Sequence, residues 1–233
     1  MAVKRLSTVE KAFRVLVAVS ERQPVGLGEL ARSLDLDKAA VQRILATLGD
    51  LGWIAPATPP ATGWVLTPEA LVVGRRYAPE LRDRARPHLE ALQAETGETA
   101  GLVMVDRDRV VVVDVVDSQQ PLRVTVPIGF DAPLADFQPF LAFFPDSELT
   151  ALAAAGTYRL SAPQREAHRR RGWYVLEMEP LDVRALGAPV PGPGDTVLAA
   201  LLLVAPRTRL GRDRQQEVGP LLRTAADAIS PGA

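Results

Sequence analysis

Residues 38–48 read KAAVQRILATL, and the first third of the chain is organised around them. Its apolar residues recur at gaps of three and four, which predicts a helix with one buried face: Val41, Ile44, Leu45 and Leu48. The other face carries Lys38, Ala39, Ala40, Gln42, Arg43 and Thr47. In a DNA major groove, Arg can grip guanine, Gln can grip adenine and alanine methyls can touch thymine. An ordinary solvated surface would have the same composition, so the flanking segments decide between the two.

A second short helix is predicted directly before this one. Residues 27–34 are amphipathic, with Leu30, Ala31 and Leu34 expected to face inward. Only three residues connect the two helices, and Asp37 can cap the second. Two short helices joined by so tight a turn indicate a helix-turn-helix.

A hairpin is predicted directly after it. Gly52 is expected to end the helix, Trp53-Ile54 to begin a strand, and Trp64 to Leu66 to return after a turn over residues 58–63. A hairpin in this position makes the motif a winged helix-turn-helix. Thr62 lies near the tip of the predicted wing. Lys4 and Arg5 lie on an N-terminal arm that could reach a neighbouring phosphate or be solvated.

The third helix of this domain is expected to begin at Ser7, with Ser7 and Glu10 forming a capping box, and to end near Gln23-Pro24. Its predicted buried residues are Val9, Ala12, Phe13, Leu16 and Val19. Thr67 and Pro68 begin a further helix, to about Tyr77, which would lead out of the wing. The predicted divisions are therefore residues 1–67 for the winged helix-turn-helix domain, 68–78 for a linker helix and 79–233 for a second domain.

Composition restricts the class of protein. The 233 residues are 47% hydrophobic and 24% charged, as in ordinary globular proteins, and there are no cysteines, so disulfides and thiolate metal sites are excluded. No apolar run approaches a membrane span or a signal peptide, so a cytoplasmic location is expected. The net charge is −1, but ten Lys or Arg against seven acids give residues 1–78 a charge of +3. This small basic excess agrees with phosphate contacts made by the first domain.

The second domain is predicted to be an α+β domain with a six-stranded, mainly antiparallel sheet between its first and last helices. The first helix is expected over residues 80–95, with Pro87 either kinking it or marking its start a turn earlier. The predicted strands are residues 99–105, 110–116, 122–126, 173–177, 183–189 and 196–204. Short helices are expected at 137–144, at 147–155 after an Asp146 cap, and after a Ser161–Gln164 capping box up to Gly172. The last helix is expected over 212–229.

Motifs along the whole chain resemble the IclR family of bacterial transcriptional regulators. In the first domain they are residues 7–12, 43–48, 52–54 and 66–69. In the second they are residues 96–100, 133–134, 171–173, 188–190 and 206–210. The resemblance implies a winged-helix DNA reader, a linker helix that helps dimerisation and a GAF-like domain that senses a small molecule. It also implies homodimers or homotetramers on palindromic operator DNA, repressing or activating their genes. No cofactor is expected.

Departures from the family pattern affect both predicted sites. Ala39-Ala40 stand where members carry Ser-Thr, which removes two hydroxyls from the reading helix. Serines that line the effector pocket in the family fall at Leu202 and Val204. The residues assigned to the effector site are Leu122, Val124, Phe137, Gln138, Glu177, Val183, Ala185, Leu202 and Val204. A site without those hydroxyls should prefer an apolar or aromatic effector over a small carboxylate. Alternatively, these side chains form plain core and bind nothing.

Two other functional classes fit the sequence less well. An enzyme is disfavoured because His88 and His168 lie in charged helices and no nucleophile elbow, phosphate loop or metal-ligand spacing is present. A winged helix that acts only through protein contacts stays open because of the double alanine and the small basic excess. The basic run Arg169 to Arg171, with Arg165, is interpreted as a solvated helix face.

Overall fold

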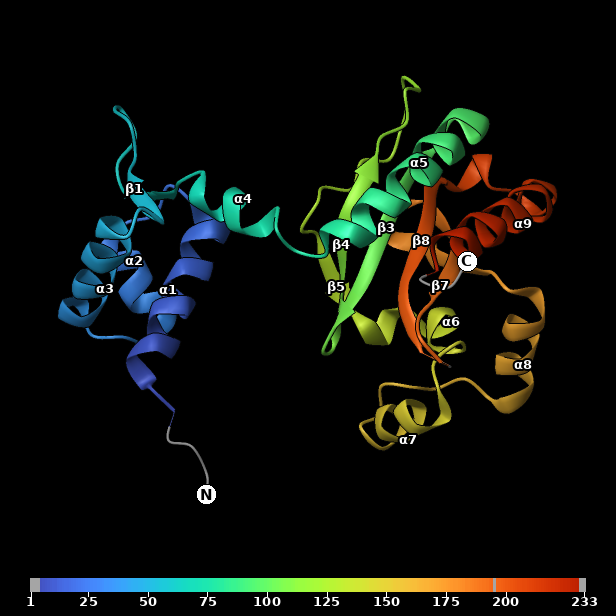
Figure 1. The fold of residues 1–233 in the computed structure, drawn as a ribbon. Coiled ribbons are helices and arrows are strands. Elements are labelled where there is room, and N and C mark those ends of the chain that lie inside the picture. Colours follow the sequence, from blue (N-terminus) through green and yellow to red (C-terminus); the bar gives the residue numbers. More distant parts are fainter. Residues whose placement is uncertain (1–4, 195, 231–233) are drawn as a thin grey trace. The chain divides into compact units, whose positions relative to one another are not determined.

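The computed structural model describes residues 5–230 except Asp195, so Lys4 lies outside the described residues (Figure 1). The chain divides into two compact units, Met1–Pro79 and Glu80–Ala233. Each has a hydrophobic core of its own. No helix in the described part of the chain is both long and apolar enough to cross a membrane.

Unit 1 is a winged helix-turn-helix. Its elements are α1 (Ser7–Arg22), α2 (Leu27–Leu34), α3 (Lys38–Asp50), β1 (Ile54–Pro56), β2 (Trp64–Leu66) and α4 (Glu69–Gly74). The four predicted apolar residues of α3 are all buried. Asp37 caps this helix as predicted, since its carboxylate accepts a hydrogen bond from the Ala40 amide at 3.1 Å. The tight turn before it depends on Asp35, which adopts a left-handed conformation at φ 52°.

The buried face of α1 differs from the prediction. Of the predicted residues, Val19 is buried and Ala12 and Leu16 pack half-buried against the core, but Val9 is 48% and Phe13 63% exposed. Val15 and Ala18, which were not predicted, are buried. The predicted Ser7 cap is also wrong, because the N-cap is Leu6 and no side chain caps the helix. Apolar residues occur on more than one side of α1, so periodicity could not tell which side meets α2 and α3.

The wing is held by more than its own hairpin. β1 and β2 pair antiparallel, with Ile54 opposite Leu66. Val25, in the connection between α1 and α2, forms an isolated bridge with Trp64: the Val25 amide donates to the Trp64 carbonyl at 3.1 Å and the reverse bond is 2.9 Å. The wing is thereby fixed to the helical core.

The helix after the wing is shorter than predicted. It covers Glu69–Gly74 and does not reach Tyr77. Residues 75–78 continue as turns, with Ala78 at a positive φ of 44°. Thr67 Oγ1 accepts from the Glu69 amide at 3.3 Å. Leu71, Val72 and Val73 are exposed, so α4 buries little within unit 1.

Unit 2 contains an entirely antiparallel six-stranded sheet in the order β5-β4-β3-β8-β7-β6. The strands are β3 (Thr99–Asp106), β4 (Arg109–Val116), β5 (Asp131–Pro133), β6 (Tyr174–Met178), β7 (Val183–Pro191) and β8 (Val197–Pro206). The predicted strand at 122–126 is wrong, since this segment is a loop and β5 pairs with β4 in its place.

Helices cover both faces of the sheet. α5 (Pro79–Thr96), which continues through Pro87, and α9 (Arg212–Ile229) lie on one face (Figure 1). Because α5 begins at Pro79, a start one turn before Pro87 is wrong. On the other face are η1 (Leu134–Asp136) and α6 (Gln138–Leu141), followed by α7 (Asp146–Ala154) and α8 (Ala162–Arg171). A third 3-10 turn, η3 (Arg207–Arg209), joins β8 to α9, and η2 (Glu179–Leu181) joins β6 to β7.

The predicted starts of α7 and α8, and the predicted exposure of the basic side of α8, were only partly correct. The Ser161–Gln164 capping box is confirmed, but α7 begins at Asp146 after Pro145, without a side-chain cap. The basic side of α8 is not simply solvated, contrary to the prediction. Arg165 and Arg169 donate to the carbonyl oxygens of Ala142 and Phe144, at 2.8–3.3 Å. The Arg171 guanidinium lies 4.2 Å from the centre of the Trp173 ring. Arg165 and Arg169 hold α8 against the segment after α6.

Candidate functional site

The exposed side of α3 brings together most of the residues assigned to DNA. Lys38, Ala39, Gln42, Arg43 and Thr47 are exposed and Ala40 is half-buried. Their positions follow from burial of the opposite side of the same helix. Thr62 is exposed near the tip of the wing, and Arg5 is exposed ahead of α1. Thr47 donates its hydroxyl hydrogen to the Arg43 carbonyl at 2.9 Å, which occupies that donor within the helix.

The charge on this surface suits a polyanion. α3 has no acidic residue in its first turn, and its next acid after the Asp37 cap is Asp50 at its last residue. In the described part of the chain, neither Lys38 nor Arg43 is in a salt bridge. Their charges are therefore available to phosphates or base edges.

A groove of about 540 Å³ runs between α1 and α3. Its lining is mainly apolar, and it includes Arg43 and Thr47 from the exposed side of α3. Phe13 on α1 and Leu51 after α3 are its exposed apolar residues, at 63% and 65% exposure. Sequence reasoning missed this groove because it placed Phe13 in the core.

In unit 2, the core of the predicted effector site lies on one face of the sheet. Ala185 is directly opposite Val204, and directly opposite residues of an antiparallel pair point to the same side. Val183, Ala185, Leu202 and Val204 belong to a single buried cluster, against which Phe137 and Val124 pack. We call the side of the sheet occupied by this cluster the α6 face, since α6 covers it.

Three residues assigned to the effector site are placed elsewhere. Glu177 alternates with Leu176 and Met178 of this cluster, so its side chain points to the opposite face, where it pairs with Arg184 at 2.7 Å. Leu122 is 71% exposed and outside the cluster. Gln138 lies near the cluster, but its amide already donates to the carbonyls of Ala135 and Thr157 and accepts from the Arg159 amide. These three residues were assigned from their positions in the sequence, and a position in the sequence does not determine to which face of the sheet a side chain points.

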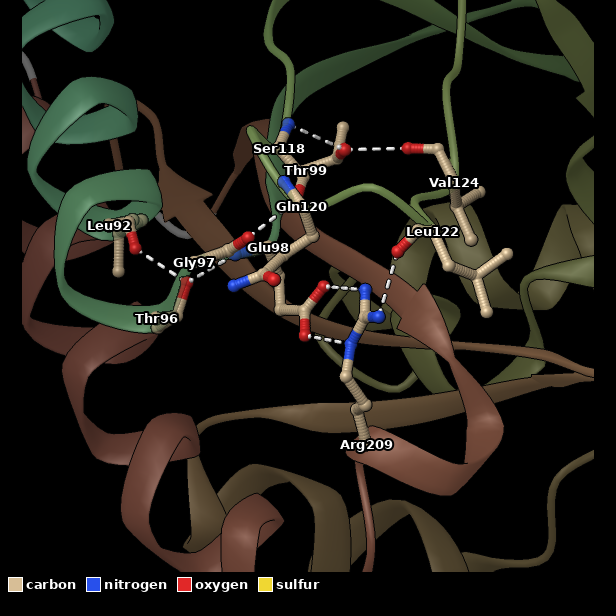
Figure 2. A network of polar contacts seen from close by, with 10 residues as sticks. All are labelled: Leu92, Thr96, Gly97, Glu98, Thr99, Ser118, Gln120, Leu122, Val124 and Arg209. Atoms are coloured by element: carbon tan, nitrogen blue, oxygen red, sulfur yellow. Dashed lines mark hydrogen bonds and ion pairs between the residues drawn. The ribbon is translucent and has the colours of Figure 1, made fainter.

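A polar network that sequence reasoning missed borders the α6 face. Figure 2 shows the Arg209 guanidinium bound to both carboxylate oxygens of Glu98, at 2.6 and 2.7 Å. Arg209 also donates to the Leu122 carbonyl at 2.8 Å. The Glu98 side chain is 7% exposed, and its hydrogen bond raises the pKa of Arg209. The family resemblance pointed to both segments, residues 96–100 and 206–210. No local sequence pattern could predict that Glu98 and Arg209 form an ion pair, because 111 residues separate them.

The same network fixes the loop over residues 117–126. The Thr99 hydroxyl donates to the Val124 carbonyl at 2.6 Å and accepts from the Ser118 amide at 3.1 Å (Figure 2). Thr99 lies opposite Val204 and so on the α6 face. The loop that replaces the predicted third strand is thus attached to the edge of the apolar cluster, which places Val124 against it.

Tyr174 is a further residue of the α6 face that was missed. It is fully buried, and its hydroxyl has no hydrogen-bond partner among the described residues. Burial raises the pKa of Tyr174 well above its usual value, so the hydroxyl stays neutral and can donate. No sequence pattern pointed to this residue, because a tyrosine in a strand of alternating apolar residues is typical of core.

Comparison with known proteins agrees with both halves of this architecture. The IclR helix-turn-helix domain matches residues 8–56, and the bacterial transcriptional regulator IclR C-terminal domain matches residues 77–231. The HTH-type transcriptional regulator KdgR of Escherichia coli is 28% identical over 97% of this chain and 92% of its own.

Solved structures show the same fold over the full length. The IclR transcriptional regulator of Alicyclobacillus acidocaldarius aligns with a TM-score of 0.80 at 22% identity, covering 97% of this chain and 98% of its own. HmgR of Pseudomonas aeruginosa aligns with a TM-score of 0.74 at 25% identity, covering 96% and 97%. With both domain models matched in order, the chain belongs to the IclR family and is a transcriptional regulator with a helix-turn-helix DNA-binding domain and an IclR C-terminal domain.

Proposed function

We propose that this protein is a cytoplasmic, non-enzymatic regulator that binds operator DNA through α3 and the wing and responds to a small apolar or aromatic metabolite in unit 2. The observation that carries the DNA-binding half is the unpaired charge and exposure of the α3 surface. Arg43 and Gln42 are the proposed base readers, and Lys38 a phosphate contact. Thr62, Arg5 and Lys4 are proposed to reach the flanking backbone, and Ala39 and Ala40 to lie against the bases.

Homodimerisation is part of this proposal, because one helix in one groove reads too few base pairs to be selective. Unit 1 supports it with exposed apolar side chains at helical spacing, at the N-cap Leu6 and along α1 at Val9, Phe13 and Val17. α4 adds Leu71, which is 76% exposed. Exposed apolar stripes of this kind mark association surfaces. Two such dimers could form a tetramer.

The proposed effector site comprises Val183, Ala185, Leu202 and Val204, with Phe137 and Val124 at its edge. Its support is the uncharged character of the α6 face. The buried charged residues of unit 2, Glu98 and Asp114, are both paired with arginines, Arg209 and Arg86. An apolar ligand would be accepted there, whereas a carboxylate would lose its hydration without a partner.

The DNA-binding proposal is tested by titrating the full chain against the region upstream of its own gene at several salt concentrations. Affinity should fall steeply with rising salt, because phosphate contacts release counterions. Arg43→Ala should weaken the specific site by roughly 5- to 150-fold, the value of a good base contact, and weaken random duplex less.

Arg22→Ala is the matched control, since Arg22 is exposed in the last turn of α1 and is not one of the residues assigned to DNA. It should leave specific affinity within about twofold, as expected for a surface residue without a contact. Equal, weak binding of the unsubstituted chain to specific and random duplex would favour the alternative, a winged helix that acts through protein contacts.

A further inference from the structure

Four residues form a row across the α6 face of the sheet. Gly101 on β3 is opposite Leu202 on β8, Leu202 is opposite Gly187 on β7, and Gly187 is opposite Tyr174 on β6. Directly opposite residues point to the same side. Two glycines therefore flank Leu202, a residue of the proposed effector site.

Gly187 makes room for the tyrosine ring. A Cβ atom at Gly187 would lie 2.2 Å from Tyr174 Cζ and 2.5 Å from its hydroxyl oxygen. The ring thus lies flat over the strand, and its hydroxyl extends toward the middle of the face. Phe140 and Phe143 hold it from the side of α6, with ring centres 5.7 and 6.0 Å away. The hydroxyl is held in place although nothing among the described residues accepts its hydrogen.

Gly101 leaves space at the other end of the row. It is buried, yet a Cβ atom built on it would meet only the Asp114 carbonyl oxygen, at 3.5 Å. Leu202, between the two glycines, is 8% exposed and not fully enclosed. The row thus combines room for a small group, an apolar middle and one buried, unused hydrogen-bond donor.

We propose that the Tyr174 hydroxyl anchors the effector by donating a hydrogen bond to it, and that the effector is a neutral aromatic compound with one oxygen acceptor, such as a ketone or ester. Its hydrocarbon part would lie over Leu202 and Gly101. This inference rests on the proposed sensing function of unit 2. An unpartnered buried donor favours a ligand that accepts a hydrogen bond. No lysine or arginine among the residues that the structure describes is buried, which disfavours an anion.

Calorimetry on the full chain with three probes tests this: acetophenone, ethylbenzene, which lacks the carbonyl oxygen, and pyruvate. Tyr174→Phe should weaken acetophenone about tenfold, the value of one neutral hydrogen bond, and leave ethylbenzene unchanged. The variant should fold, because it removes a hydroxyl without a partner. Tyr77→Phe, at a 52% exposed tyrosine of unit 1, should change neither affinity.

Gly101→Ala provides a second, independent variant. Its methyl group fits without a clash but fills the space over β3, so it should weaken acetophenone and ethylbenzene alike, by several-fold. Gly211→Ala is the matched control, since a Cβ atom there meets nothing within 4 Å.

The outcomes separate the two proposals. If both aromatic probes bind but Tyr174→Phe leaves the ratio of their affinities unchanged, the tyrosine anchor is overturned and apolar sensing stands. If the unsubstituted chain binds neither aromatic probe, or binds pyruvate alone, apolar sensing fails and this inference fails with it.

Discussion

At the scale of single residues, the ion pair between Glu98 and Arg209 links the two ends of unit 2's sequence. It joins the start of β3 to η3, and through Arg209 it also holds the Leu122 carbonyl. The Glu98 carboxylate is 7% exposed and so has lost most of its hydration on folding. Without the Arg209 guanidinium, nothing would compensate for that loss. The pair therefore fixes the loop that carries Val124 at the edge of the α6 face.

Replacing Arg209 by Met should destabilise unit 2 by about 2–3 kcal/mol. This is below the roughly 3–5 kcal/mol typical of fully buried pairs, since Arg209 is itself 31% exposed. Urea unfolding followed by circular dichroism measures the change. Arg207→Met in the same 3-10 turn is the control. Arg207 pairs with Asp182 at the surface, so a loss of less than about 1 kcal/mol is expected. Equal losses in the two variants would refute a structural role for the Glu98–Arg209 pair.

Local residue chemistry was predictable only in part, even where partners are close in sequence. The Asp37 cap and the Ser161–Gln164 box are confirmed, whereas the Ser7 and Asp146 caps are wrong. The Glu98–Arg209 pair spans 111 residues, and the partners of Arg165 and Arg169 are backbone carbonyls of another segment. Such partners are set by tertiary packing, so the sequence alone could not supply them.

At the scale of elements, the wing depends on Gly63. Its φ is +118°, and a Cβ atom there would lie 2.8 Å from the Val25 carbonyl carbon and oxygen. The bridge between Val25 and Trp64 thus requires a residue without a side chain next to it. Sequence reasoning found the turn from its glycine and prolines, but it did not foresee that the wing closes onto the connection between α1 and α2.

Gly63→Ala should therefore separate the wing from the helical core. Clash and backbone strain together should cost about 2–4 kcal/mol and should also weaken DNA binding by displacing Thr62. Urea unfolding and the DNA titration measure the two effects. Gly52→Ala is the control: its φ is +78°, but a Cβ atom meets nothing within 4 Å, so only about 1–2 kcal/mol of strain is expected. Indistinguishable losses would mean that contact with Val25 does not hold the wing.

The bounds and buried sides of elements were well predicted where apolar residues lie on one side only. They were poorly predicted where apolar residues lie on two sides. α2, α3 and α9 have the predicted bounds or nearly so, because each buries a single stripe. α1 presents apolar residues on two sides, and Val9 and Phe13 of its exposed side were taken for core. The loop at 122–126 has strand-like alternation but is fixed by side-chain bonds from Thr99 and Arg209 in place of a strand partner. Neither outcome can be read from local periodicity.

At the scale of the whole molecule, the second stripe of α1 has a consequence for assembly. Leu6, Phe13 and Val17 are each more than half exposed, although similar side chains of unit 1 are buried. Leaving them in water is unfavourable at roughly 25 cal/mol per Å² of apolar surface. Association of two copies through this stripe would remove that cost and supply the second reading helix that operator recognition needs.

Phe13→Glu should shift the protein from dimer toward monomer at micromolar concentration, because it places a charge in the centre of the proposed contact. Since Phe13 is 63% exposed within its own chain, the fold of unit 1 should be preserved, with a stability change within about 0.5 kcal/mol per monomer. Sedimentation equilibrium measures the association and circular dichroism the fold. Ser20→Glu is the control, because Ser20 is exposed at the far end of α1 and its hydroxyl donates one turn back within the same helix, to the Val17 carbonyl at 2.7 Å. If the Phe13→Glu protein remains dimeric and binds operator DNA normally, the dimer contact lies elsewhere in the chain. If it becomes monomeric and loses its specific DNA affinity, dimerisation through α1 is required for operator recognition.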